Sequence, residues 1–266
     1  MSSSYFTLPD FKAGKADFHI HSVMSDGVAT IKEILDHVNN YTDLDVISIT
    51  DHDTMANWEL VQKWMHKKDY RFKVIPGQEI TTLGGHLIAL NIRKEIAKHR
   101  SLHETILEIH RQGGLAIIPH PLGWITSGVT KRDIMHLAKH TSGDFYLDAI
   151  ELFNSSPAGR QGQRKAIELN RKVLKVAEVG SSDAHNLSLI GKCHTLFPGS
   201  TPEDLIRAIK EKKTIASGSF MSIRDTLKLM KERNSLYRRV YKKYLRHRIR
   251  KLPLLNRKKK AAKIFP

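Results

Sequence analysis

Three short motifs of this chain combine histidines and acidic residues at close spacing. They are HIH (19–21), DHD (51–53) and DAH (183–185). Side chains at positions i and i+2 of a strand point to the same face, so both can reach one ion. Imidazole and carboxylate groups are common ligands of zinc, manganese and iron in proteins. The residue types and their spacing therefore predict metal binding.

Each motif lies in or at the end of a short apolar run that reads as a buried strand. Charged groups are costly to bury unless they are paired or bound to a metal. Glu79 and His120 also stand at the ends of apolar runs, and Asp26 follows the first run in an SDG sequence. In α/β barrels the catalytic face lies at the carboxyl ends of the strands. We therefore expect about eight potential ligands at one rim, enough for two or three divalent ions.

The apolar runs alternate with amphipathic patterns that predict helices. We expect strands at 16–21, 45–50, 72–80, 86–92, 115–120, 147–154, 174–185 and 213–218. We expect helices at 30–41, 54–67, 101–112, 131–140, 159–172 and 201–212. Near-continuous apolar strands separated by helices predict a parallel sheet covered on both faces. About seven such units favour a closed or nearly closed barrel, and a doubly wound open sheet is the alternative.

Length and composition fit one large catalytic domain. The chain has 266 residues, of which 40% are hydrophobic, and a (β/α) barrel takes about 250. Its single cysteine, Cys193, excludes an internal disulfide framework. We find no secretory signal and no apolar run near the roughly 18 residues of a transmembrane helix. We therefore expect a cytoplasmic protein.

The positive charge is concentrated at the carboxyl end. Residues 224–266 hold 17 Lys/Arg and 2 Asp/Glu, whereas the other 223 residues hold 27 and 25. We expect a catalytic domain at 1–223 and, at 224–266, a basic amphipathic helix with a disordered end. Such a segment can dock on the domain, bind nucleic acid or attach to an anionic membrane surface.

Single histidines carry little weight, because the chain has 15 and most lie in helical or surface stretches. The ordered combination is far more specific, and it resembles the PHP (polymerase and histidinol phosphatase) family of metal-dependent hydrolases. The stretches that carry the resemblance are DFHIHSVMSDG, ISITDHDT, IPGQEITT, GGHLIALNI, IPHPLGW, AIELFN and GSSDAHN. The resemblance implies a distorted (β/α)7 TIM-like barrel with two or three divalent ions, usually Mn, Zn or Fe.

The resemblance also implies how the ligands divide among the ions. The ligands of the first ion would be His19, His21, Glu79 and Asp183. The ligands of the second would be Glu79 as a bridge, His120 and His86. The ligands of the third would be Asp26, His52 and His185. His86 is the weakest member of the set, because it begins its apolar run rather than ending it.

The reaction that this site implies is hydrolysis of a phosphoester by a hydroxide that bridges the metals. The hydroxide would attack phosphorus in line, and a metal or a protonated histidine would assist the leaving oxygen. We expect Asp51, Asp183 and His185 to take part in catalysis. Asp51 and Asp53 also flank His52, where a carboxylate more often orients the imidazole than binds the metal.

The substrate class stays open at this point. Family members resembling this chain hydrolyse small phosphomonoesters, nucleotides or short oligonucleotides, and some relatives act on carbamates or other esters without phosphorus. TIM-barrel amidohydrolases also begin with HxH, but they typically end in a lone aspartate rather than the SDAH found here. A non-catalytic, metal-stabilised module that binds nucleic acid is the alternative from another class.

Overall fold

The computed structural model describes residues 13–123, 127–140, 143 and 145–222, together with 224, 227, 230–232, 234 and 235. The chain divides into two compact units, Met1–Ser222 and Ile223–Pro266. The described residues of the second unit are helical, and the rest of the predicted basic tail lies outside the described residues. All of the histidine and aspartate motifs lie in the first unit.

The first sheet contains strands from both ends of the first unit. Its order is β10 (Ile215–Gly218), β9 (Cys193–Pro198), β1 (Ala13–Asp17), β2 (Val46–Ile47) and β3 (Lys73–Val74). Strands β1, β2 and β3 are parallel, whereas β9 pairs antiparallel with both β1 and β10. The β9 strand was not among the predicted strands, because no acidic or histidine motif marks its end.

The second sheet comes from the middle of the chain. Its order is β4 (Gly77–Thr82), β5 (Gly85–Leu90), β6 (Leu115–Ile118), β7 (Ala149–Asn154) and β8 (Ala177–Ser181). The β4–β5 and β5–β6 pairs are antiparallel, and the β6–β7 and β7–β8 pairs are parallel. The predicted parallel pairing therefore holds for β1–β2–β3 and β6–β7–β8, but it is wrong for the other pairs. The two-residue link between β4 and β5 is too short for the crossover that a parallel pair needs.

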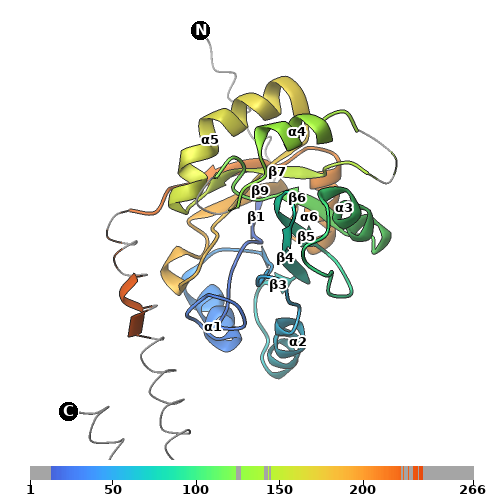
Figure 1. The fold of residues 1–266 in the computed structure, drawn as a ribbon. Helices are drawn as coiled ribbons and strands as arrows, with labels where there is room; N and C mark the ends of the chain where they lie inside the picture. Colours follow the sequence, from blue (N-terminus) through green and yellow to red (C-terminus); the bar gives the residue numbers. More distant parts are fainter. Residues whose placement is uncertain are drawn as a thin grey trace, which may run out of the picture. The chain divides into compact units, whose positions relative to one another are not determined.

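The α-helices described for the first unit lie around its strands (Figure 1). They are α1 (Ile31–Tyr41), α2 (Asn57–Lys67), α3 (Leu102–Arg111), α4 (Lys131–Leu137), α5 (Pro157–Leu169) and α6 (Pro202–Lys210). A π-helical turn, Asn170–Leu174, continues α5, and a short 3₁₀ helix spans Leu187–Leu189. The predicted capping box at Thr30 and Glu33 is present, with both reciprocal bonds formed. Helix α1 thus begins where its sequence signal predicts, whereas α2 begins at Asn57 rather than at 54 and α5 at Pro157 rather than at 159.

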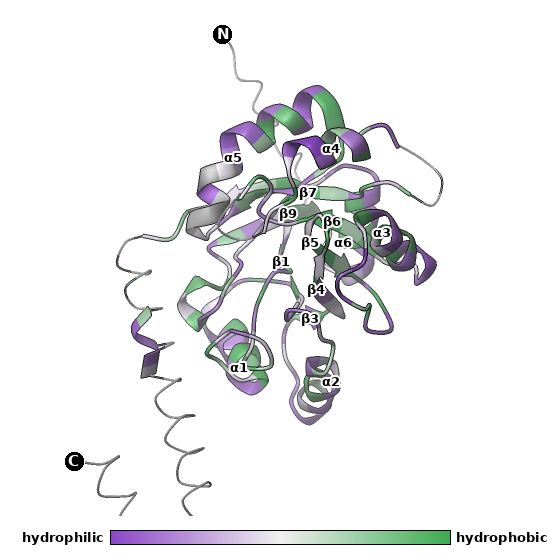
Figure 2. Cartoon of the chain, in the orientation of Figure 1, coloured by the Kyte–Doolittle hydropathy of each residue, from purple (hydrophilic) through white to green (hydrophobic). Residues whose placement is uncertain are grey.

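The core between the two sheets is built from alternate residues of their strands. Ala16 and Val46 of the first sheet belong to one buried cluster with Ile117 and Val179 of the second. Two further clusters lie between the sheets and the helices. Figure 2 shows the resulting pattern, with hydrophobic strands inside and helices that are hydrophilic on part of their surface. This is a mixed α/β fold.

Two isolated parallel bridges link the sheets near the carboxyl ends of the strands. They pair Ile20 with Ala184 and His52 with Glu79. Among the described residues, the hydrogen-bonded ladders form two sheets rather than one closed barrel, so the TIM-like barrel stays a prediction. No helix in the described parts of the chain is long and apolar enough to cross a bilayer.

Candidate metal centre

The backbone pairing of the motifs brings them to one place. The His21 amide donates to the Ala184 carbonyl over 2.9 Å, and the Thr50 amide donates to the Ile20 carbonyl over 2.9 Å. The Asp53 amide donates to the Glu79 carbonyl over 2.8 Å. The HIH segment therefore lies between DAH on one side and DHD on the other, and Glu79 lies next to DHD.

Glu79 is the centre of the cluster. Its carboxylate is buried, with a side-chain exposure of 1%, and five histidines surround it. Its Oε2 lies 3.1 Å from His19 Nε2, 3.2 Å from His21 Nε2 and 3.2 Å from His52 Nδ1. Its Oε1 lies 2.9 Å from both His86 Nδ1 and His120 Nε2. A single carboxyl group cannot neutralise five imidazolium groups, so this arrangement suits shared binding of cations better than pairwise ion bridges.

Four overlapping groups have ligand atoms close enough to hold an ion, with all atoms of a group within 4.8 Å of one another. They are His19–His21–Asp183, His19–Glu79–His120, His52–Glu79–His86 and His21–Asp26–His52–His185. The structure thus brings together all nine residues predicted as ligands. It also places His86 nearer to His52 than the predicted division implied, while His86 and His120 still share Oε1 of Glu79.

The cluster has a buried side and a more accessible side. The side chains of His19, His21 and His120 are at most 2% exposed. Those of His52 and Asp26 are 28% and 36% exposed. A ligand from solvent would therefore meet the cluster from the side of His52 and Asp26.

A further observation supports the binding of divalent cations by these side chains. Both ring nitrogens of His21 are buried without a hydrogen-bond partner among the described residues. Glu79 and Asp183 lie 3.2 and 3.4 Å from Nε2, but neither contact has hydrogen-bond geometry. A buried imidazole without hydrogen bonds is unfavourable, and coordination of an ion at Nε2 would compensate for this loss.

Opposite charges set the protonation of the buried side. Burial opposes charge on His21, but Asp183 and Glu79 outweigh it and raise the pKa of the imidazole to about 9. Burial also opposes charge on Glu79, yet His19 and its neighbours hold the pKa of this carboxyl well below its ordinary value. Carboxylates that stay ionised in a buried site are suited to metal ligation, in which cations replace the protons of the imidazoles.

Glu151 positions His19, although it was not among the predicted site residues. This carboxylate is buried within β7, and its Oε1 lies 2.9 Å from His19 Nδ1. Its Oε2 accepts from the His120 amide over 2.8 Å and from Asn154 Nδ2 over 2.8 Å. A carboxylate on one ring nitrogen fixes the tautomer and leaves the other nitrogen for a metal. Its position inside the apolar run AIELFN was the signal that could have revealed it.

Among the described residues, Asp51 and Asp53, which flank His52, form no hydrogen bond with its imidazole. Asp51 is fully buried and accepts from the Ser22 amide and hydroxyl, from Ser25 Oγ and from Asn57 Nδ2. Asp53 accepts from the Thr81 amide and hydroxyl. Asp51 therefore holds the loop that carries Asp26, and its catalytic role stays a prediction.

The loop that carries Asp26 also depends on a glycine. A Cβ atom at Gly27 would lie 2.3 Å from the His21 carbonyl oxygen, and the Gly27 amide donates to the Ser22 carbonyl over 3.0 Å. This close approach explains the SDG sequence. It also brings Asp26 Oδ1 to 3.0 Å from His185 Nε2.

Asp183 and His185 lie inside the cluster as predicted. Asp183 Oδ1 is 3.4–3.5 Å from the Nε2 atoms of His21 and His19, and Asn154 Nδ2 approaches Oδ2 at 3.4 Å. His185 Nδ1 lies 3.0 Å from the Asp183 carbonyl oxygen, so this nitrogen donates. The lone pair of His185 is then at Nε2, on the side of Asp26, which suits a ligand better than a proton donor.

Three residues of the site have left-handed backbone angles. Asp53, His120 and Asp183 have φ values of 55°, 28° and 54°. Residues with a Cβ are strained in this region, and such strain occurs often at functional sites. Each of these residues follows a strand or a bridge. The left-handed backbone changes the direction of the chain there, where the side chains of His120 and Asp183 lie in the cluster.

Comparisons with known proteins identify the family. The uncharacterized protein MJ1587 of Methanocaldococcus jannaschii is 35% identical over 172 residues, which cover 60% of this chain and 92% of the relative. A family model described as PHP-associated (PHP_C) matches residues 163–214. This chain belongs to the PHP family. The family predicted from the HIH, DHD and DAH motifs is thus confirmed.

Solved structures show the same PHP fold at low sequence identity. One is a two-domain Bacteroides vulgatus protein containing a predicted PHP-like metal-dependent phosphoesterase, with a TM-score of 0.63 and 21% identity. The alignment covers 80% of this chain and 66% of that chain. Another is the lesion-specific endonuclease PfuEndoQ of Pyrococcus furiosus, with a TM-score of 0.52, 19% identity, and coverage of 75% and 56%.

Proposed function

We propose that this PHP protein is a metal-dependent hydrolase that cleaves phosphoesters. The observation that carries the proposal is the contact of one buried carboxylate, Glu79, with five histidines at 2.9–3.2 Å. Structural histidines do not need a shared carboxylate, and an ion pair does not need five partners. A site that holds several divalent ions needs both a carboxylate that ions can share and several imidazole ligands.

The four groups of potential ligands overlap at Glu79, His19, His21 and His52, and they support two or three ions. The Glu79 carboxylate could be shared between ions, whereas each imidazole nitrogen would bind one ion. Such ions lower the pKa of bound water and stabilise the charge that develops on phosphoryl oxygens. Manganese, zinc and iron all accept this mixture of imidazole and carboxylate ligands.

The protein's own groups orient the site and determine its access. Glu151 holds His19 with Nε2 towards Glu79, and the Asp183 carbonyl holds His185 with Nε2 towards Asp26. Asp51 fixes the loop of Asp26 through Ser22 and Ser25. A phosphoryl group would enter at the accessible side, where His52 and Asp26 lie.

A nucleotide or a short oligonucleotide is the substrate class that the chain supports best. Residues 224–266 carry a net charge of +15, and a basic segment favours the phosphate backbone of nucleic acids. One solved structure with this fold is a lesion-specific endonuclease.

We further propose that the tail forms a separate unit after a catalytic domain at 1–223, and that the two sheets act as one distorted barrel. The shared core and the two bridges support the barrel.

The test combines metal analysis with hydrolysis in a matched pair of variants. We would purify the wild type, Asp183→Asn and Asp53→Asn, load each with Mn²⁺, measure bound metal, and assay nucleotides, short oligonucleotides and a chromogenic phosphodiester. We expect two or three ions per chain in the wild type, and loss of bound metal and turnover in Asp183→Asn. Asp53→Asn should keep most of both, because Asp53 faces Thr81. Bound metal without turnover of any phosphoester would contradict the phosphoesterase assignment, and equal losses in both variants would contradict the site.

A further inference from the structure

A cavity lies at the opposite ends of the strands from the Glu79 cluster. Residues 146–148, which precede β7, and Leu174 and Val176, which precede β8, form part of its wall. The cluster residue Asp183, in contrast, follows β8. The cavity has a volume of about 310 Å³, at the lower end of the range of small-molecule pockets.

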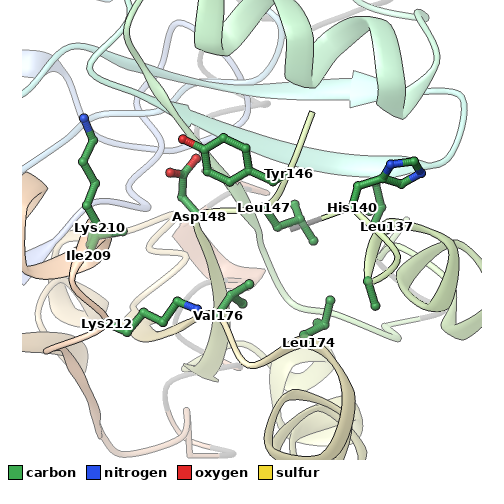
Figure 3. Close-up of a pocket in the computed structure, with 11 residues that line it drawn as sticks. Leu137, His140, Tyr146, Leu147, Asp148, Leu174, Val176, Ile209, Lys210 and Lys212 are labelled. Carbon is green, nitrogen blue, oxygen red and sulfur yellow. The ribbon is translucent and has the colours of Figure 1, made fainter. Parts of the chain in front are cut away.

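The lining of this cavity is basic on one side and apolar on the other. Figure 3 shows Lys210 and Lys212 on the same side, with Leu137, Leu147 and Leu174 facing them across the cavity. Neither lysine forms an ion pair with a residue that the structure describes. Positive charge without a protein partner beside an apolar wall favours a ligand that has both an anionic and an apolar part.

The backbone supplies an independent observation about the same cavity. Lys212, at the end of α6, has a φ of 56°, and Lys175, between the lining residues Leu174 and Val176, has a φ of 53°. These left-handed positions follow helical segments, where glycine is the usual residue. At both positions next to this cavity, a strained lysine is found instead of a relaxed glycine.

The one acidic residue of the lining does not neutralise these lysines. Asp148 Oδ2 accepts from the Ala116 amide over 2.8 Å and lies 2.9 Å from His110 Nε2. The His110 ring in turn stacks on Tyr146 with 4.4 Å between centroids. The charge of Asp148 is thus directed at His110, and this contact fixes the Tyr146 ring as a flat part of the wall.

We propose that this cavity binds a small molecule that joins a phosphate to a flat ring, of which a nucleoside monophosphate is the simplest representative. Lys212, whose amine points towards Val176 in Figure 3, would contact the phosphate, and the exposed Lys210 on the same side would turn towards it. The ring would pack against Tyr146 and the leucines. The site is separate from the metal centre, so its occupation does not depend on the proposed hydrolysis.

The test is calorimetric titration of the full-length protein with adenosine 5′-monophosphate, with metals removed by a chelator so that the nucleotide is not cleaved. Lys210→Ala/Lys212→Ala should weaken binding by at least about tenfold, as expected for the loss of charge-assisted contacts. The matched control is Lys63→Ala/Lys94→Ala, which removes the same charge from exposed positions outside the cavity lining and should leave the affinity unchanged.

Three results would overturn the proposal. They are no saturable binding at millimolar nucleotide, equal weakening in both double variants, and loss of binding in Glu79→Gln. The second result would assign the binding to overall charge, and the third would assign it to the metal centre. Retained binding in Glu79→Gln, together with the selective loss in Lys210→Ala/Lys212→Ala, would support a separate site even if no phosphoester were hydrolysed.

Discussion

Two kinds of buried carboxylate occur at the same rim of the strands, and their partners differ. Glu79 and Asp183 face imidazole nitrogens. Asp51 instead accepts hydrogen bonds from a backbone amide, two serine hydroxyls and an asparagine amide. The first kind has partners that a cation can share or replace, whereas the second kind is already satisfied by neutral donors. The donors around a carboxylate therefore separate metal ligation from positioning better than burial does.

The sharpest test of this comparison is Glu79→Gln. An amide of the same shape cannot carry the charge that the ions require, so we expect bound metal to fall and turnover to drop by about 10³-fold or more. Elemental analysis and initial rates measure the two effects. Glu178→Gln on β8 is the control and should leave both unchanged. Full metal content in Glu79→Gln would show that the comparison is wrong.

Asp51→Asn should lower the stability of the protein rather than its metal content. The substitution places an NH₂ group against donors that need an acceptor, so the free energy of unfolding should fall by about 2–4 kcal/mol. Urea denaturation of the chelated protein measures this change. Asp26→Asn is the reciprocal variant, because its side chain is 36% exposed, and it should weaken metal binding with little loss of stability. Similar losses of stability in Asp51→Asn and Asp26→Asn would contradict the distinction between positioning and metal-binding carboxylates.

Glu151→Gln tests a positioning residue between the two kinds. Because Glu151 contacts His19 Nδ1 and the His120 amide, we expect a loss of 10–100-fold in metal affinity, as for other carboxylates behind a ligating histidine. Competition with a metal-binding dye measures the affinity separately from turnover. Glu168→Gln, on the exposed face of α5, is the control. Unchanged affinity in Glu151→Gln would limit this residue to packing.

The antiparallel β4–β5 pair explains what the sequence could and could not predict about the site. His19, Glu79 and Asp183 were predictable because each follows or ends an apolar run. His86 was uncertain because it begins its run, and periodicity cannot show that β5 returns antiparallel to β4. The register pairs Thr81 with His86, which puts the start of β5 at the rim where β4 ends.

Side-chain partners were the other part that the sequence could not show. Asp51 and Glu151 are both carboxylates next to predicted ligands or within apolar runs, and the sequence alone favoured the first as catalytic. The structure turns Asp51 towards Ser22 and Ser25, and Glu151 towards His19. These directions depend on loop geometry and on contacts between residues more than 20 positions apart.

The smallest expected effect concerns Cys193, a buried group that lies outside the Glu79 cluster. Burial raises the pKa of its thiol to about 12, so little thiolate forms at pH 8 in the folded protein. We expect iodoacetamide to modify the thiol at pH 8 only after unfolding in urea, as followed by intact mass. Rapid modification of the native protein would show that β9, which carries Cys193, is exposed more often than its burial indicates.

The most direct test of the central claim is an anomalous difference map from crystals of the full-length protein grown with Mn²⁺. We expect two or three strong peaks around Glu79, each within about 2.0–2.3 Å of ligand atoms from the four groups, and none beside Asp51. A map without peaks at Glu79, or with its only peak elsewhere, would contradict the metal centre and the function proposed from it.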